Sequence, residues 1–130
     1  MKTVKTKAIG DTGEEYAVEY LKKHKYKILL RNYRKRFGEI DIIAEKKGTV
    51  AFVEVKTRHE NPLTKPFEAV DTKKQKKIYK TSIAYIYENN LNCQYRFDVC
   101  EVYVDRDTLK LIEINYFENA FIPESDDGYY

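Results

Sequence analysis

Two short apolar runs of the sequence, residues 38–44 and 52–58, constrain its fold most strongly. Both have the β-branched character of strands, and the polar segment between them contains a glycine, which is typical of a hairpin turn. Each run nevertheless carries charge, because Asp41 lies among isoleucines and Glu54 and Lys56 lie among valines. Charged side chains are rarely fully buried unless they are paired or bind a metal ion. The sequence therefore predicts a hairpin that brings a charged cluster into an apolar core.

The position of the turn determines which of these charged residues meet. A turn centred on Lys47-Gly48 places Asp41 directly opposite Glu54, with Cβ atoms about 5 Å apart. Lys56 lies two residues after Glu54, so their side chains share one face of the strand. A shift of the register by one residue would turn one strand's side chains to the opposite face. With this turn, we expect all three groups to converge at the end of the hairpin.

Two carboxylates and a lysine suit a metal-dependent reaction at phosphate. Mg²⁺ and Mn²⁺ prefer oxygen ligands and keep several waters, so two carboxylates and phosphate oxygens are sufficient to bind them. The metal would polarise the phosphoryl oxygen and lower the pKa of a bound water, and the lysine could orient that water. The alternative is a structural role, in which Glu54 and Lys56 form a buried ion pair with Asp41 hydrogen-bonded nearby.

The spacing of Asp41 and Glu54-Val55-Lys56 resembles the motif of the PD-(D/E)xK nuclease superfamily, which includes type II restriction enzymes and Holliday-junction resolvases. Ile40 stands where that superfamily often has proline, which removes no ligand. More closely, the chain resembles the YraN-like family of bacterial proteins. The segments that carry this resemblance are Gly10 to Glu14, Arg31-Asn32-Tyr33, Gly38-Glu39-Ile40-Asp41, residues 52–58, Lys74-Gln75 and Arg96-Phe97-Asp98-Val99.

The superfamily resemblance implies a restriction-endonuclease-like fold and a role for each motif residue. Asp41 and Glu54 would bind Mg²⁺ or Mn²⁺, with the carbonyl oxygen of Val55 as a further ligand. Lys56 would position the water that attacks phosphorus. The reaction would be the hydrolysis of a phosphodiester bond in DNA, and the enzyme would select its substrate by structure rather than by sequence.

Glu14 is a further candidate for the same site. It shares a helical face with Ala17, Val18 and Leu21, so it should point toward the sheet. Resolvase-like members of the superfamily carry a metal-linked glutamate on their first helix, and Glu14 matches that position. Asp11 and Glu14 also fit a capping box, in which the glutamate side chain accepts a hydrogen bond from the backbone amide of the N-cap residue, here Asp11. Both interpretations stay open at the level of sequence.

Basic residues cluster in two blocks, at positions 22–36 and 73–80, although the net charge is only +3. Clusters of this kind suit the phosphate backbone of nucleic acid, and a solvated lysine face is the alternative. The start of a helix near residue 72 would add free amide donors that favour phosphate. The candidates for nucleic-acid contact are Arg34, Arg36, Arg58, Lys73, Lys74, Gln75 and Lys77.

We expect DNA, including branched DNA, rather than RNA as the partner, and the resemblance to junction resolvases implies a homodimer. Two other functions stay open. One is a non-catalytic nucleic-acid-binding module that retains the nuclease fold. The other is an assembly protein whose basic face meets an acidic partner.

The hydrophobic pattern predicts an α/β domain with the element order α-β-β-β-α-β-β and a mixed central sheet flanked by helices. Asp11 should open the first helix, Asp71 should cap a second helix over residues 71–89, and Tyr26, Ile28 and Leu30 should alternate along the first strand. A polar loop should follow the hairpin over residues 57–64. The chain of 130 residues should form one domain over residues 1–117, followed by a short acidic tail over residues 118–130.

The sequence also predicts a cytoplasmic protein. It has no apolar run of the length that a membrane span requires, and its basic N-terminus lacks the apolar centre of a signal peptide. Its two cysteines, Cys93 and Cys100, lack metal-ligand spacing. We expect both to be buried thiols in a reducing compartment.

Overall fold

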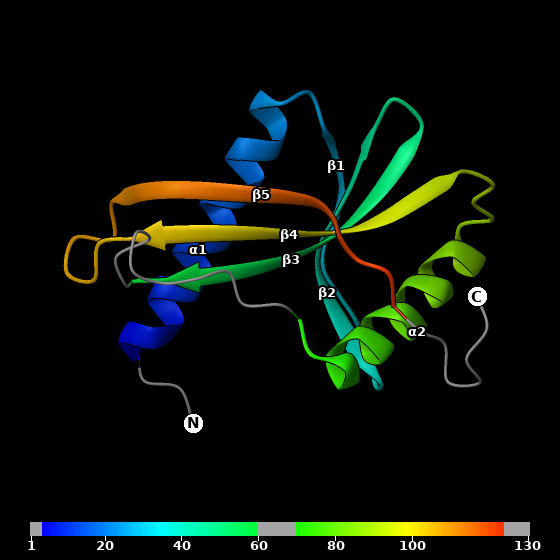
Figure 1. The fold of residues 1–130 in the computed structure, drawn as a ribbon, viewed down its shortest axis with the longest axis horizontal. Coiled ribbons are helices and arrows are strands. Elements are labelled where there is room, and N and C mark those ends of the chain that lie inside the picture. Colours follow the sequence, from blue (N-terminus) through cyan, green and yellow to red (C-terminus); the bar gives the residue numbers. More distant parts are fainter. Residues whose placement is uncertain (1–3, 60–69, 124–130) are drawn as a thin grey trace.

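The computed structural model describes residues 4–59 and 70–123, which form two helices and five strands. Their order along the chain confirms the predicted mixed α/β class (Figure 1). The elements are α1 (Val4–Lys23), β1 (Lys27–Lys35), β2 (Gly38–Lys46), β3 (Thr49–Arg58), α2 (Thr72–Glu88), β4 (Gln94–Val104) and β5 (Leu111–Phe121).

The strands form one five-stranded sheet in the order β1-β2-β3-β4-β5. Strands β3 and β4 are parallel, and the other neighbouring pairs are antiparallel. A parallel pair needs a crossover connection, and the chain between β3 and β4 contains α2. The mixed sheet therefore follows from inserting one helix between the third and fourth strands.

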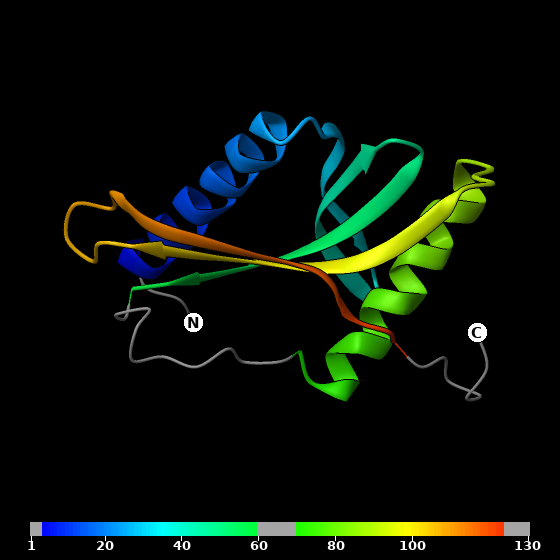
Figure 2. The ribbon, with the colours of Figure 1, turned by 45° about the horizontal axis from the view of Figure 1, so that its top comes forward.

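The two helices pack against opposite faces of the sheet (Figure 2). Leu21 of α1 packs in a core with Val53 of β3, whereas Ile78 of α2 packs in a second core with Phe52. Val53 and Phe52 are adjacent in β3, and adjacent strand residues point to opposite faces. The core therefore consists of two apolar layers, one on each side of the central strand.

The first helix begins earlier than Asp11, where the sequence pattern placed its start. Because α1 runs from Val4, Asp11 lies inside the helix, so the prediction that Asp11 opens it is wrong and the alternative of a capping box with Glu14 does not hold. Asp11 instead forms an exposed ion pair with Lys7, 3.4 Å away and one turn earlier. Ile9, which is buried, anchors this early part of the helix. The cap of α2 is confirmed, because the Asp71 carboxylate accepts a bond from the Lys74 amide at 2.8 Å.

The alternation predicted for the first strand fails at Leu30. The pairing of β1 with β2 shifts between Ile28 and Leu30, which marks a β-bulge. Ile28 packs on the α1 side and Leu29 on the α2 side, and Leu30 is left 40% exposed. The extra residue therefore changes which side chains face the core.

The last strand runs to Phe121, so residues 118–121, assigned from the sequence to the acidic tail, belong to β5. Residues 124–130 of that tail lie outside the described residues, as do residues 60–64 of the predicted loop. Thr57 and Arg58, which begin that loop in the sequence prediction, are strand residues.

The two cysteines are in different environments. Cys100 is buried and Cys93 is exposed, so the prediction of two buried thiols is wrong for Cys93. Both are free thiols. Cys93 is exposed because it lies just before β4, outside the two apolar layers. No helix in residues 4–59 and 70–123 is long and apolar enough to cross a membrane.

Candidate functional site

The hairpin of β2 and β3 has the predicted turn and register. Lys47 and Gly48 have φ angles of 51° and 81°. Two positive angles are the requirement of a type I′ turn, whose twist matches that of paired strands. The pairs run from Lys46 opposite Thr49 to Ile42 opposite Val53. This is the register that brings Asp41 and Glu54 to matching positions.

The sheet divides immediately beyond these pairs. The pairing of β2 with β3 ends at Ile42 and Val53, after which β2 continues with β1 alone and β3 continues with β4 alone. Figure 1 shows β2 and β3 running apart from this point. Asp41 and Glu54 are the first residues past the division. The Val55 amide, which would extend the ladder, donates instead to Asp41 Oδ2 at 2.8 Å.

This position makes the charged form of Asp41 unfavourable. Burial raises the pKa of Asp41 from its ordinary value of 3.8 to about 8, and the neighbouring Glu54 and Glu14 carboxylates add to the rise. The bond from the Val55 amide opposes the shift without cancelling it. Two buried carboxylates whose charges repel each other fit a hard divalent cation, which would favour ionisation of both.

Lys74 of α2 compensates part of this negative charge. Its Nζ lies 3.0 Å from Glu54 Oε1, and the Glu54 side chain is only 10% exposed. Burial lowers the pKa of Lys74, but the carboxylates of Glu54, Asp41 and Asp71 together outweigh burial and leave the pKa raised. The ion pair that the structure gives Glu54 is therefore with Lys74, whereas the structural alternative considered from the sequence paired Glu54 with Lys56. The position of Lys74 in the first turn of a predicted helix was the signal available in the sequence.

Lys56 and Arg58 lie on the same side of β3 as Glu54, as the strand periodicity predicts. All three line an open pocket of about 290 Å³, together with Val55 and Lys74. Lys56 is half-buried in this pocket. A ligand in the pocket would meet three cationic side chains and two carboxylates, those of Glu54 and Asp71, within one small space.

Glu14 reaches the neighbourhood of Asp41 because α1 approaches β3 very closely. A Cβ atom on Gly13 would lie 1.9 Å from Thr57 Oγ1, so only glycine permits this contact. Burial raises the pKa of Glu14, and the nearby Arg31 guanidinium partly opposes the rise. Among the residues that the structure describes, no three Asp, Glu, His or Cys side chains form a group that could hold a metal ion. Glu14 therefore influences Asp41 electrostatically without joining Asp41 and Glu54 as a third clustered carboxylate.

The candidate nucleic-acid contacts fall into separate places. Arg34, Arg36 and Lys77 line one groove between α2 and the turn that joins β1 to β2. The side-chain amide of Gln75 donates to the Val70 carbonyl at 2.8 Å, so it ties the first turn of α2 to the chain that enters the helix. The remaining three lie at the start of α2 and the end of β3: Lys73, which is exposed, and Lys74 and Arg58, which line the pocket beside Glu54.

The fold and site define a mixed α/β protein with two buried carboxylates where its sheet divides. The model of the uncharacterised protein family UPF0102 matches residues 13–102, and the chain belongs to this family. A UPF0102 protein of Caldanaerobacter subterraneus is 46% identical over 122 residues, covering 93% of this chain and 100% of that protein. A second, of Alkaliphilus oremlandii, is 48% identical over 118 residues, covering 88% and 98%. A third, of Caldicellulosiruptor saccharolyticus, is 44% identical over 114 residues, covering 87% and 96%.

Proposed function

We propose that this protein is a nuclease of the PD-(D/E)xK superfamily that hydrolyses phosphodiester bonds in DNA with Mg²⁺ or Mn²⁺. The observation that carries the proposal is the contact between the Asp41 and Glu54 carboxyl groups where the sheet divides. Burial and repulsion by the Glu54 carboxylate raise the pKa of Asp41 to about 8. A cation bound between the two groups would favour the ionised form of both. A purely structural pair of carboxylates would gain nothing from this arrangement.

The bound cation would supply Lewis-acid activation of the phosphate and a water of lowered pKa. The carboxylates of Asp41 and Glu54 would hold it, with the Val55 carbonyl as a third oxygen ligand. Glu14 would add negative charge from α1 through a water. In this arrangement Lys56 orients the attacking water from its place in the same pocket as Glu54.

Lys74 has a separate role in the proposed reaction. Its ammonium is bonded to Glu54, and a cation on that carboxylate would weaken the ion pair. Lys74 would then be available to a phosphate oxygen of the substrate. Arg58 lines the same pocket and would hold a second phosphate oxygen.

The proposed substrate is DNA that is recognised by structure, such as a junction, a flap or an end. The basic side chains of β1 and α2 would contact the phosphate backbone without reading its sequence. We further propose that two copies of the chain form a homodimer, which would present two sites to two strands.

The test is cleavage of linear and branched DNA with Mg²⁺, Mn²⁺ or EDTA. Wild-type protein should cut only with a cation, and Asp41→Asn and Lys56→Ala should each lower the rate by about 100-fold or more. Lys110→Ala, an exposed lysine of the turn between β4 and β5, should cut like the wild type. Mn²⁺ should also raise the melting temperature of the wild type and leave that of Asp41→Asn unchanged. Cleavage that survives in Asp41→Asn would reject the proposed site.

The second candidate function is a non-catalytic nucleic-acid-binding module. It is favoured by the groove that contains Arg34, Arg36 and Lys77, which could bind phosphate without a metal. If the wild type cuts nothing and shifts DNA as well as Asp41→Asn does, this function replaces the nuclease.

A further inference from the structure

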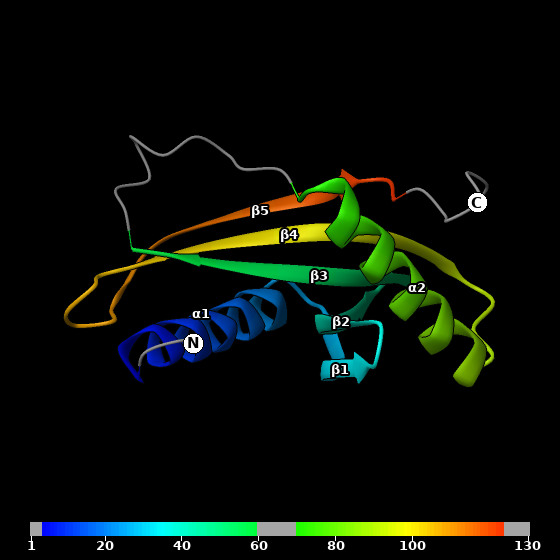
Figure 3. The ribbon, with the colours of Figure 1, turned by 90° about the horizontal axis from the view of Figure 1, so that it is seen from below.

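Positive charge is concentrated in one groove of about 520 Å³ between α2 and the turn that joins β1 to β2. Figure 3 shows this turn next to α2. We call it the basic groove, and its charged lining residues are Arg34, Lys35, Arg36, Lys76, Lys77, Lys80 and a single carboxylate, Glu39. The whole chain has a net charge of only +3, so this groove carries more positive charge than the chain as a whole.

The walls of the basic groove are held firmly together. A Cβ atom on Gly38 would lie 2.6 Å from Thr81 Oγ1 and 2.9 Å from the Lys77 carbonyl oxygen, so the turn touches the helix backbone. Thr81 is itself fully buried. Because the contact is close, the backbones of the two walls keep their spacing without a ligand, which lowers the cost of binding.

Three of the cations are available to a ligand. Arg34 is bonded to Glu39 and Lys35 to Glu88. Arg36, Lys76 and Lys77 form no ion pair with any residue that the structure describes. These three come from both walls of the groove, as expected for a surface that follows a phosphate backbone.

An aromatic ring lies among these cations. Phe37 lines the basic groove at the tip of the turn and is 38% exposed, although phenylalanine is usually buried. An exposed ring among cations suits a nucleotide base, because every base has a face that can stack. In a duplex those faces are already stacked on neighbouring bases, whereas an unpaired strand leaves them accessible.

The basic groove and the site around the acidic pair both draw on neighbouring stretches of the same two elements, α2 and β2. Lys77 lies three residues after Lys74 on α2, a rise of about 4.5 Å. Gly38 lies three residues before Asp41 on β2, a distance of about 10 Å along the strand. A strand bound in the groove would therefore continue toward Asp41 and Glu54 within a short distance.

We infer that the basic groove binds single-stranded nucleic acid, with Phe37 stacking on a base and Arg36, Lys76 and Lys77 contacting phosphates. Applied to the proposed nuclease, on which this part of the inference rests, the substrate is an unpaired segment such as an overhang or a flap. The groove would bind that segment, and the acidic pair would act on a phosphodiester bond beside it.

The experiment measures fluorescence anisotropy of labelled oligonucleotides in EDTA, so that cleavage does not interfere. The probes are a single-stranded DNA, a single-stranded RNA of the same sequence and the corresponding blunt DNA duplex. Wild-type protein should bind an unpaired strand more tightly than the duplex. Phe37→Ala should weaken single-strand binding roughly 5- to 160-fold, the range measured for removal of one base-stacking aromatic. Phe37→Trp should restore it, and duplex binding should be unchanged.

Two controls separate stacking from charge and from folding. Tyr87→Ala removes an aromatic side chain that is 78% exposed on the last turn of α2, and it should bind like the wild type. Lys77→Gln should weaken every probe and reduce the slope of log affinity against log salt by about one. Full retention of both single-strand affinities in Phe37→Ala, or an equal loss for the duplex, would overturn the inference. Cleavage assays test the proposed nuclease separately. A protein that stacks Phe37 on an unpaired base but does not cut DNA would contradict only the nuclease proposal.

Discussion

Asp41 is the residue on which the electrostatics of the site depend. Burial and the neighbouring Glu54 and Glu14 carboxylates all disfavour its ionised form, and the hydrogen bond from the Val55 amide compensates only partly. The environment of Glu54 differs, because the Lys74 ammonium lies 3.0 Å from Glu54 Oε1 and forms an ion pair with it. The two carboxylates of the pair are therefore unequal, and a cation would change Asp41 most.

The stability of the folded protein should depend on pH through Asp41. Its pKa rises from 3.8 in the unfolded chain to about 8 in the folded state, so the folded state binds the proton more tightly. This contribution to stability is fully present below pH 4 and is lost as the pH rises through 8. Urea titrations in EDTA should therefore give a free energy of unfolding that falls between pH 5 and pH 9.

Two variants and one ion test this assignment. Asp41→Asn should flatten the fall with pH, whereas Glu113→Gln, an exposed carboxyl on β5, should leave it unchanged. Mn²⁺ at about 100 times its dissociation constant should restore about 2.7 kcal/mol to the wild type at pH 8. An identical pH dependence in wild type and Asp41→Asn would assign the titration to another group.

At the scale of elements, the approach of α1 to β3 brings Glu14 near the site. Gly13 should be intolerant of a side chain, because its Cβ would lie 1.9 Å from Thr57 Oγ1 and 2.6 Å from Thr57 Cγ2. Overpacking of this kind costs about 1–3 kcal/mol. Gly13→Ala should lower the free energy of unfolding by that amount in urea titrations.

Gly10 provides a matched control on the same helix. A Cβ on Gly10 would meet nothing within 4 Å, so Gly10→Ala should stabilise the protein by up to about 1 kcal/mol through helix propensity. If both variants were stabilised, α1 would have to lie farther from β3 than the structure places it.

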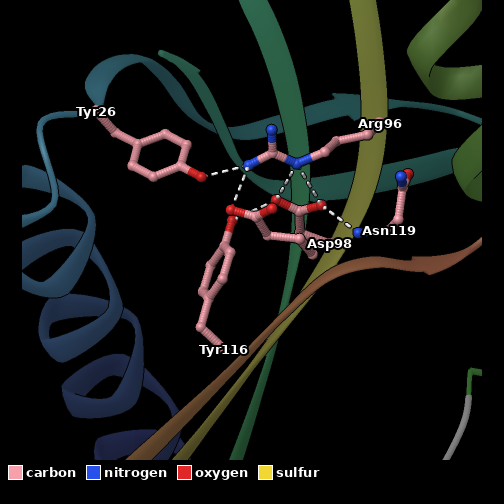
Figure 4. A network of polar contacts seen from close by, with 6 residues as sticks. Tyr26, Arg96, Asp98, Tyr116 and Asn119 are labelled. Atoms are coloured by element: carbon pink, nitrogen blue, oxygen red, sulfur yellow. Dashed lines mark hydrogen bonds and ion pairs between the residues drawn. The ribbon is translucent and has the colours of Figure 1, made fainter.

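For the molecule as a whole, a buried polar network joins distant parts of the sheet (Figure 4). Asp98 of β4 has no exposed surface. Its carboxylate accepts hydrogen bonds from Arg96 Nε at 3.0 Å, Tyr116 Oη at 2.6 Å and the backbone amide of Asn119 at 3.0 Å. Arg96 also bonds to Tyr26, which precedes β1. The network therefore connects β4, β5 and the chain that enters β1.

Removal of the charge of Asp98 should destabilise the whole fold. Asp98→Asn would leave the Arg96 guanidinium, which is 17% exposed, without its buried partner, and loss of one partner of such a pair costs about 3–5 kcal/mol. Glu118→Gln removes the other carboxylate that Arg96 contacts, which is 64% exposed, and should cost less than about 1 kcal/mol. Calorimetry of both variants tests this, and equal losses would contradict it.

The sequence by itself determined the features that depend on neighbouring residues. Alternating side chains and the Lys47-Gly48 turn were sufficient to predict the β2–β3 hairpin and the matching positions of Asp41 and Glu54. The cap of α2 by Asp71 and the order of the elements were predicted in the same way. All of these rest on backbone preferences and periodicity within one or two elements, which a single sequence carries directly.

Only the tertiary structure decided the features that join distant segments. The partner of Glu54 is Lys74 on another element rather than Lys56 two positions away. The start of α1, the bulge in β1 and the contact of Gly13 with Thr57 likewise depend on packing between elements. Close approach and ion-pair choice are set by which surfaces meet in space, and residue spacing along the chain does not specify this.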